Sequence, residues 1–206
     1  MKHGIPDDIF KDKKLAKHVT SHGPVSLGEW KRPKQPFHSL IRAIIHQQVS
    51  GSAAASILKK FQDQFEGRLP SPKQVLEIST DKLRAAGLSQ SKVIYVKDLA
   101  KHFAEGAIKP RQFRSMSNEE IVEHLTRVKG IGVWTAQMFL IFTLKRPDIL
   151  PTLDLGIRKG FQIVYGLKRL PEHKQMERLA YQWRKHASLA SLYLWKAADT
   201  QKGRKN

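Results

Sequence analysis

The chain has 206 residues, of which 37 are Lys or Arg and 18 are Asp or Glu, so its formal net charge is +19. Such a basic balance indicates a polyanionic partner, most often nucleic acid, and no apolar run reaches the roughly 20 residues of a membrane-spanning helix. Hydrophobic residues make up 40% of the chain, enough for one compact domain or two small lobes. The absence of cysteine excludes disulfides, thiolate catalysis and a cysteine-ligated iron–sulfur cluster.

Helical signals follow one another along the chain, without an alternating strand pattern and without an internal repeat. A short helix is expected over residues 8–20, and apolar residues at helical spacing predict another over 37–48. Ser71 and Pro72 mark a helix start, with Gln74 at the capping-box position. Further helices are expected at 50–65, 81–86, 89–105, 117–127, 133–144, 155–165, 171–185 and 188–198. The pattern predicts an all-α fold.

A glycine hairpin follows the helix that begins at the capping box of Ser117 and Glu120. Gly130 and Gly132 permit a tight reversal with positive φ and without a Cβ in the way. The next helix starts at once, so its first N–H groups favour an anion such as phosphate, and Lys129 adds positive charge. The alternative is a plain turn between two helices.

Asp154 lies in a loop that contains Pro147 and Pro151 and leads into the helix at 155–165. Aspartate is favoured at a helix N-cap, so a purely structural role is one interpretation. The other is catalytic, because a carboxylate can stabilise developing positive charge or activate water. One residue can fill both roles.

Residues 129–136, KGIGVWTA, resemble the helix-hairpin-helix of the HhH-GPD DNA glycosylase superfamily, and residues 150–155, LPTLDL, resemble the loop that carries its catalytic aspartate. The resemblance spans residues 37–195 and is closest to the alkylpurine branch, 3-methyladenine DNA glycosylase II. It implies two helical lobes with the active site in the cleft between them and no N-terminal β domain. The implied lobes are residues 37–148, with the hairpin, and residues 1–36 plus 149–206.

The resemblance also implies roles for residues in catalysis and base recognition. Asp154 would be the catalytic residue, stabilising positive charge on the sugar as in glycoside hydrolysis. Trp134, Met138 and Trp195 would form the base pocket, although aromatic residues in apolar helices can also be core. Trp134 stands where lyase-competent relatives carry a lysine that forms a Schiff base, so strand cleavage is not expected. Met138 stands where some alkylpurine relatives have tyrosine, which leaves the shape of the pocket open.

A second set of residues would contact the duplex. A side chain from the segment HQQVS would fill the gap left by the removed base: Gln48 aligns best, with His46 and Gln47 as alternatives, and a solvated helix junction is the structural interpretation. Lys129, Gly130, Gly132 and Thr135 would bind phosphate. The nine histidines show no metal-ligand spacing, and no cofactor is expected. The superfamily commonly holds a monovalent cation at the turn equivalent to 127–132.

The leading hypothesis is therefore a monofunctional DNA glycosylase that excises 3-methyladenine and 7-methylguanine from double-stranded DNA in base excision repair. We expect an intracellular monomer located with the DNA, because the N-terminus lacks an apolar signal region. Two alternatives remain. The same fold could act on uracil, hypoxanthine or mismatched bases, or the chain could be a helix-hairpin-helix DNA-binding protein without catalysis.

Overall fold

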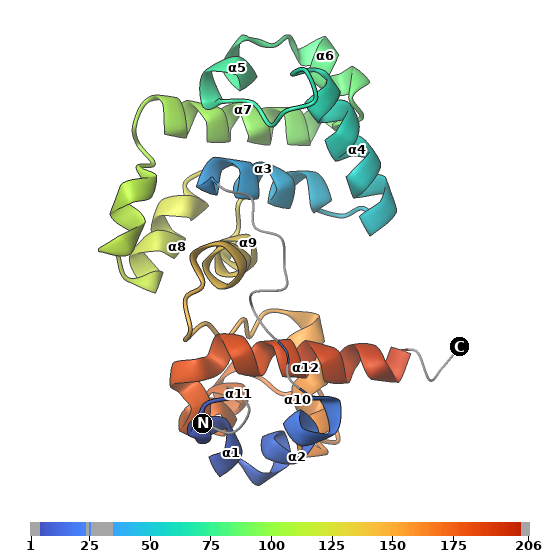
Figure 1. Ribbon diagram of the computed structural model, residues 1–206, viewed down its shortest axis with the longest axis vertical. Helices are drawn as coiled ribbons and strands as arrows, with labels where there is room; N and C mark the ends of the chain where they lie inside the picture. Colours follow the sequence, from blue (N-terminus) through green and yellow to red (C-terminus); the bar gives the residue numbers. More distant parts are fainter. Residues whose placement is uncertain (1–4, 24, 26–34, 203–206) are drawn as a thin grey trace. The chain divides into compact units, whose positions relative to one another are not determined.

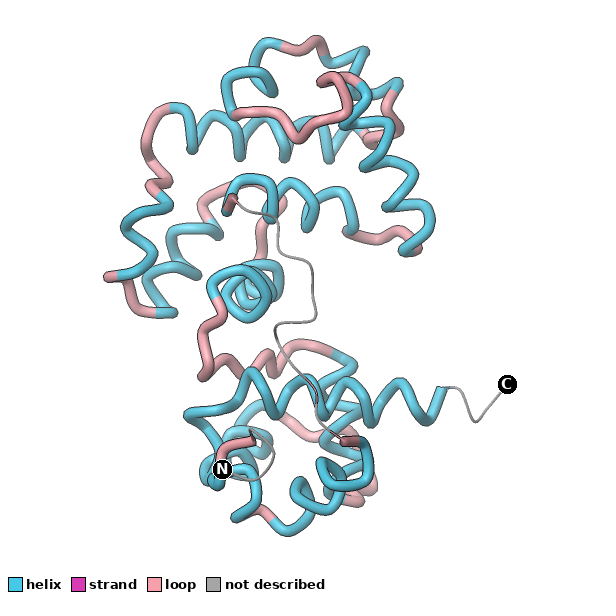
Figure 2. Tube along the Cα trace, viewed as in Figure 1, coloured by secondary structure: helices cyan, strands magenta, loops and turns pink. Residues whose placement is uncertain are grey.

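The computed structural model describes residues 5–23, 25 and 35–202, and within these ranges it contains helices and no β-strand (Figure 2). The predicted all-α fold is therefore confirmed for the described part of the chain. The chain divides into two compact units, which are described separately (Figure 1). Residues 32–139 form the central unit, and residues 1–31 together with 140–206 form the terminal unit.

The central unit is built around α7, Gln90–Ala104, which packs against α3, Pro36–His46, and α5, Pro72–Glu77. The contact between α3 and α7 is apolar and buried: Leu40 and Ile44 of α3 and Val96 of α7 are fully buried. The other helices of this unit are α4 (Gly51–Asp63), α6 (Thr80–Ala85), the 3₁₀ helix η1 (Pro110–Arg114), α8 (Asn118–Thr126) and α9 (Val133–Phe139).

Serine residues determine where most helices of the central unit begin. The hydroxyl of each one accepts a hydrogen bond from the backbone N–H three residues later, which satisfies a group that the helix itself leaves unpaired. The five capping residues are Ser50, Ser71, Ser79, Ser89 and Ser117. The capping boxes predicted at Ser71 and Ser117 are both present.

The terminal unit is organised around the packing of α10, Leu155–Tyr165, on α12, Ala187–Lys202. A Cβ at Gly160 of α10 would lie 2.3 Å from the carbonyl oxygen of Leu194, so the two helices approach closely because this residue is glycine. The remaining elements are α1 (Asp7–Lys11), α2 (Lys13–His22), the π-helical turn η2 (Leu140–Leu144), α11 (His173–Ala180) and the 3₁₀ helix η3 (Tyr181–His186).

Three predicted helices are interrupted. The helix expected at 8–20 divides at Asp12, whose Oδ1 caps α2 and whose Oδ2 accepts hydrogen bonds from the Tyr165 hydroxyl at 2.5 Å and Trp183 Nε1 at 3.3 Å. The helix expected at 133–144 changes from α-helical to π-helical after Phe139. The helix expected at 171–185 changes from α-helical to 3₁₀ after Ala180, and within η3 the backbone is kinked at Trp183, which has non-helical angles.

The boundary between the units falls between Phe139 and Leu140, whereas the sequence suggested one after residue 148. Residues 140–148 belong with the terminal unit through specific contacts. The backbone N–H of Ser188 donates to the carbonyl oxygen of Pro147 at 2.9 Å, and the ring of Phe142 stacks on Trp195. Among the residues described, no helix combines the length and apolar composition that a membrane span requires.

Candidate functional site

Asp154 is the N-cap of α10 in the terminal unit. Its Oδ1 accepts a hydrogen bond from the backbone N–H of Ile157 at 2.8 Å and a second from Trp195 Nε1, also at 2.8 Å. The capping role and the contact with Trp195 therefore fall on the same oxygen. Two donors on one oxygen hold the half-buried carboxylate in a single orientation.

Glycine in α10 makes the contact between Asp154 and Trp195 possible. A Cβ at Gly156 would lie 2.8 Å from Cδ1 of Trp195 and 3.0 Å from Oδ1 of Asp154, so a larger residue would displace the indole or the carboxylate. The other side of the indole is held by Phe142, with ring centroids 5.8 Å apart and an angle of 28° between the rings. Gly156 and Gly160 were not predicted as site residues, although glycines four residues apart lie on the same face of a helix and permit close packing.

The loop before Asp154 is anchored on one side and exposed on the other. Thr152 is buried, and its hydroxyl lies 2.6 Å from Nδ1 of His173 at the start of α11. Leu153 and Leu155, which flank the aspartate, expose 68% and 52% of their surface. The carboxylate is therefore displayed between two solvent-exposed apolar side chains on a loop whose base is held in place.

The hairpin of the central unit needs glycine at one of its two glycine positions. Gly130 has φ +81°, and a Cβ there would lie 2.2 Å from the ring of Tyr95. Gly132 does not have positive φ, and a Cβ there would meet no atom within 4 Å. The expectation of positive φ at both glycines is thus wrong for Gly132, because a single left-handed residue completes the reversal.

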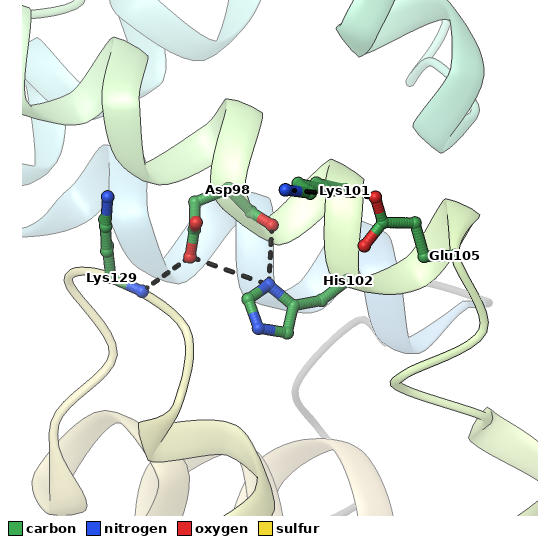
Figure 3. Close-up of polar contacts among 5 residues, drawn as sticks. All are labelled: Asp98, Lys101, His102, Glu105 and Lys129. Atoms are coloured by element: carbon green, nitrogen blue, oxygen red, sulfur yellow. Dashed lines mark hydrogen bonds and ion pairs between the residues drawn. The ribbon is translucent and has the colours of Figure 1, made fainter.

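Lys129 contacts a carboxylate of its own protein through its backbone. Its N–H donates to Oδ2 of Asp98 on α7 at 2.8 Å, while its exposed side chain extends away from this contact (Figure 3). The Gly132 carbonyl accepts from the N–H of Ala136 as α9 begins. The N–H groups of Val133 and Thr135, in the first turn, have no acceptor within the helix. The N–H groups suited to an anion are therefore those after Gly132.

A cavity of about 680 Å³ lies in the central unit, beside this hairpin. It brings together residues that the sequence placed in three separate roles: base recognition, gap filling and phosphate binding. The predicted site residues that line it are His46, Gln47, Gln48, Gly130, Gly132, Trp134, Thr135 and Met138, and the other lining residues are Ala43, Ser89, Ser91, Lys92 and Tyr95. Lys129 is not part of the lining.

The two glutamines of the HQQVS segment differ in what they contact. Gln47 Nε2 donates to the Gly130 carbonyl at 2.8 Å and lies 3.5 Å from the Thr135 hydroxyl, so this side chain ties the end of α3 to the hairpin. Gln48 is exposed and has φ +55°, a left-handed conformation that is uncommon for a residue other than glycine. Of the two, Gln48 has the side chain available to reach a ligand.

His46 and Trp134 are also exposed at this cavity. Partial desolvation beside the cavity, together with the positive charges of Arg42 and Lys92, lowers the pKa of His46. Trp134 exposes 44% of its surface, too much for a core side chain. Met138 lines the same cavity one turn further along α9, whereas Trp195 lies in the terminal unit with Asp154.

Three residues on α7 that were not predicted from the sequence contact the predicted site. Lys92 is 8% exposed, and its Nζ donates to the Ile45 carbonyl at 2.7 Å; burial lowers the pKa of this amine. Tyr95 packs on Gly130, and Asp98 accepts from Lys129. The sequence signal for Lys92 was its position on the same face of α7 as buried apolar residues, where a lysine is unusual. Within the described residues, no three His, Cys, Asp or Glu side chains are grouped to hold a metal ion.

Comparisons with known proteins agree with this geometry. The model of the HhH-GPD superfamily of base excision DNA repair proteins matches residues 41–185, and the chain belongs to this superfamily. It is 34% identical over 188 residues to DNA-3-methyladenine glycosylase 1 of Schizosaccharomyces pombe, which covers 90% of this chain and 81% of that protein.

Two solved structures share the fold over nearly the whole chain. A DNA-3-methyladenine glycosidase from Bacillus halodurans has a TM-score of 0.88 at 30% identity, covering 98% of this chain and 94% of that one. The 3-methyladenine DNA glycosylase of S. pombe, in complex with abasic DNA, has a TM-score of 0.81 at 30% identity, covering 93% and 96%. The predicted two-lobed helix-hairpin-helix glycosylase fold is confirmed.

Proposed function

We propose that this protein is a DNA glycosylase that binds double-stranded DNA and excises alkylated purines, of the 3-methyladenine and 7-methylguanine type, in base excision repair. The observation that carries the proposal is the carboxylate of Asp154, held by the indole of Trp195 and by the N-terminus of α10. A protein that only bound phosphate would not require this arrangement. Membership of a superfamily of base excision repair proteins supports the same function.

The chemistry proposed for Asp154 is hydrolysis of the bond between the base and the sugar. The base leaves with the electron pair of the C1′–N bond, and positive charge develops on the deoxyribose. The Asp154 carboxylate stabilises this charge and accepts a proton from the water that attacks C1′. The indole N–H of Trp195 keeps the carboxylate in position for both steps.

DNA binding is assigned to the central unit. The hairpin at Gly130 to Thr135 would hold a phosphate through backbone N–H groups, with Lys129 and the net charge of +19 adding sequence-independent attraction. Gln48 would enter the duplex where the flipped nucleotide has left. Its side chain is exposed in the turn that follows α3, and its amide can hydrogen-bond the orphaned partner base.

The preference for alkylated purines follows from charge. Alkylation at N3 of adenine or N7 of guanine makes the base cationic, so it leaves as a neutral molecule and needs less help from Asp154. A cationic ring is attracted to the face of an indole by ~0.5–2 kcal/mol. Trp134 is the ring proposed for this contact, because it exposes 44% of its surface beside the cavity, and Met138 of the same cavity supplies an adaptable wall.

We further propose that the enzyme is monofunctional, because the side chain at position 134 is an indole and not an amine. It would act as a monomer and leave an intact abasic site. No cofactor or metal ion is part of this mechanism. A monovalent cation on the carbonyl groups of the 127–132 turn would only support the hairpin.

The test is single-turnover excision from duplexes that each carry one modified base. 3-Methyladenine and 7-methylguanine should be released much faster than neutral hypoxanthine or uracil, and faster than a mismatched normal base. A preference for uracil or hypoxanthine would overturn the alkylpurine assignment while leaving glycosylase chemistry in place. Tight duplex binding without release of any base would favour a DNA-binding protein without catalysis.

A further inference from the structure

We infer that one face of α7, formed by Lys92, Tyr95 and Asp98, positions the DNA-contacting parts of the central unit. These three residues are spaced three apart, so they lie along one side of the helix. Each contacts a different part of the predicted DNA-binding surface. The inference rests on the DNA-binding role proposed above for the hairpin and for Gln48, and makes these residues positioning residues, not catalytic ones.

Lys92 holds the end of α3, directly before the gap-filling segment. Its Nζ donates to the carbonyl oxygen of Ile45 at 2.7 Å, and its side chain is almost fully buried. The last carbonyl groups of a helix accept no hydrogen bond from within the helix and carry partial negative charge. An amine that donates to one of them is therefore favourable. Fixing Ile45 constrains the start of the turn that places Gln48 in its left-handed conformation.

Tyr95 and Asp98 hold the hairpin. The ring of Tyr95 occupies the space that a Cβ of Gly130 would need, so it packs directly on the hairpin backbone. Oδ2 of Asp98 accepts the N–H of Lys129 at 2.8 Å and lies 3.6 Å from Nδ1 of His102, which itself lies 2.9 Å from the Asp98 carbonyl (Figure 3). Oδ2 of Asp98 therefore presents an acceptor from α7 to the hairpin backbone.

The hairpin and the gap-filling turn are also joined to each other. Gln47 Nε2 donates to the carbonyl oxygen of Gly130, the same residue on which the ring of Tyr95 packs. The contacts therefore form a closed circuit: α7 contacts the hairpin, the hairpin contacts Gln47, and the end of α3 contacts Lys92 of α7. The phosphate-binding hairpin and the position of Gln48 thus depend on the same helix. Such a support keeps residues that bind DNA in a fixed geometry relative to one another.

The test compares two pairs of variants. Asp98→Ala removes the acceptor of Lys129, and Asp98→Asn retains an oxygen that can accept the same N–H. Lys92→Met removes the buried amine, and Lys101→Met on the same helix removes an equal charge from an exposed side chain. For each protein we would measure hydrogen exchange of the Lys129 amide, affinity for an undamaged duplex and single-turnover release of 3-methyladenine.

We expect Asp98→Ala to expose the Lys129 amide to exchange and to weaken duplex affinity about tenfold, with Asp98→Asn restoring most of both. Lys92→Met should leave that amide protected and slow base release about tenfold relative to Lys101→Met. Exchange at Leu40 and Ile41 in the core of α3 serves as the control for folding.

An Asp98→Ala variant with a protected Lys129 amide and parental affinity would overturn the inference, as would Lys92→Met behaving like Lys101→Met. If Asp98→Ala fails to fold, Asp98→Leu decides, because leucine fills similar space without an acceptor, and an unchanged rate of Lys129 exchange in that variant would also overturn the inference. The exchange and undamaged-duplex measurements need no catalysis. They still test the positioning role of Asp98 if the parent protein releases no base and the proposed function fails.

Discussion

The two units hold their candidate residues by different means. In the terminal unit, the half-buried carboxylate of Asp154 itself accepts two hydrogen bonds, from the Ile157 N–H and from Trp195 Nε1, and Gly156 leaves room for the indole. In the central unit, Gln48 and Trp134 are exposed, and the backbone around them is fastened from behind by hydrogen bonds. A proposed catalytic group needs one fixed orientation, whereas a surface that receives a ligand must leave its own atoms accessible.

This difference predicts that substitution of Asp154 in the terminal unit changes the rate of base release, whereas substitutions in the hairpin of the central unit change the affinity for DNA. Asp154→Asn should slow base release by between about a hundredfold and about ten-thousandfold, the range for loss of general acid–base catalysis. The amide oxygen can still cap α10 and accept from Trp195, so the fold and duplex affinity should persist. Single-turnover kinetics with Asp199→Asn as the charge-matched control measure the effect. Release at the parental rate would make the carboxylate purely structural.

The hairpin glycines should differ from each other, which sharpens the contrast within the central unit. Gly130→Ala places a Cβ on a residue with left-handed backbone angles, which costs about 1–2 kcal/mol of stability. The same Cβ would also collide with the Tyr95 ring. The substitution should weaken binding to damaged and undamaged duplex alike, by about tenfold. Gly132→Ala has room and ordinary backbone angles, so unfolding experiments should show little change. If Gly132→Ala nevertheless loses duplex affinity, the DNA backbone must come into direct contact with residue 132.

Replacing Gln48 tests whether the exposed side chain of the central unit contributes to base release. Gln48→Gly suits φ +55° and should fold normally while removing the side chain. Excision should slow about fivefold, the equivalent of ~1 kcal/mol for one lost hydrogen bond, with little effect on undamaged duplex. Glu66→Gly is the matched control, since Glu66 is exposed in the same unit with φ +54°. Equal behaviour of the two variants would remove Gln48 from the mechanism.

The smallest expected effect is a null result. Borohydride reduction during turnover should trap no covalent protein–DNA adduct, because Trp134 presents an indole to the cavity. The available control is a bifunctional glycosylase treated in parallel. A strong adduct would identify a lysine nucleophile, and Lys92 is the first to replace, since burial lowers the pKa of its amine and it lines the same cavity.

Much of the fold could be predicted from local sequence. Capping boxes and apolar periodicity located most helices of the central unit to within a few residues, because these signals act over one or two turns, whereas the 3₁₀ helix η1 was not predicted. The hairpin and the capping position of Asp154 were found for the same reason. The interruptions at Asp12 and Trp183 were not, since they depend on partners distant in the chain, including Tyr165 for both residues.

The remaining features were decided by tertiary structure. Local sequence could not show that Gln47 turns inward to Gly130 while Gln48 stays exposed, nor that Asp98 accepts the backbone N–H of Lys129. It also could not show that Trp195 donates to Asp154 from 41 residues away. The sequence by itself determined which residue types were available and where helices begin. Packing between helices decided which donor meets which acceptor, because that depends on side chains brought together only when the helices close on one another.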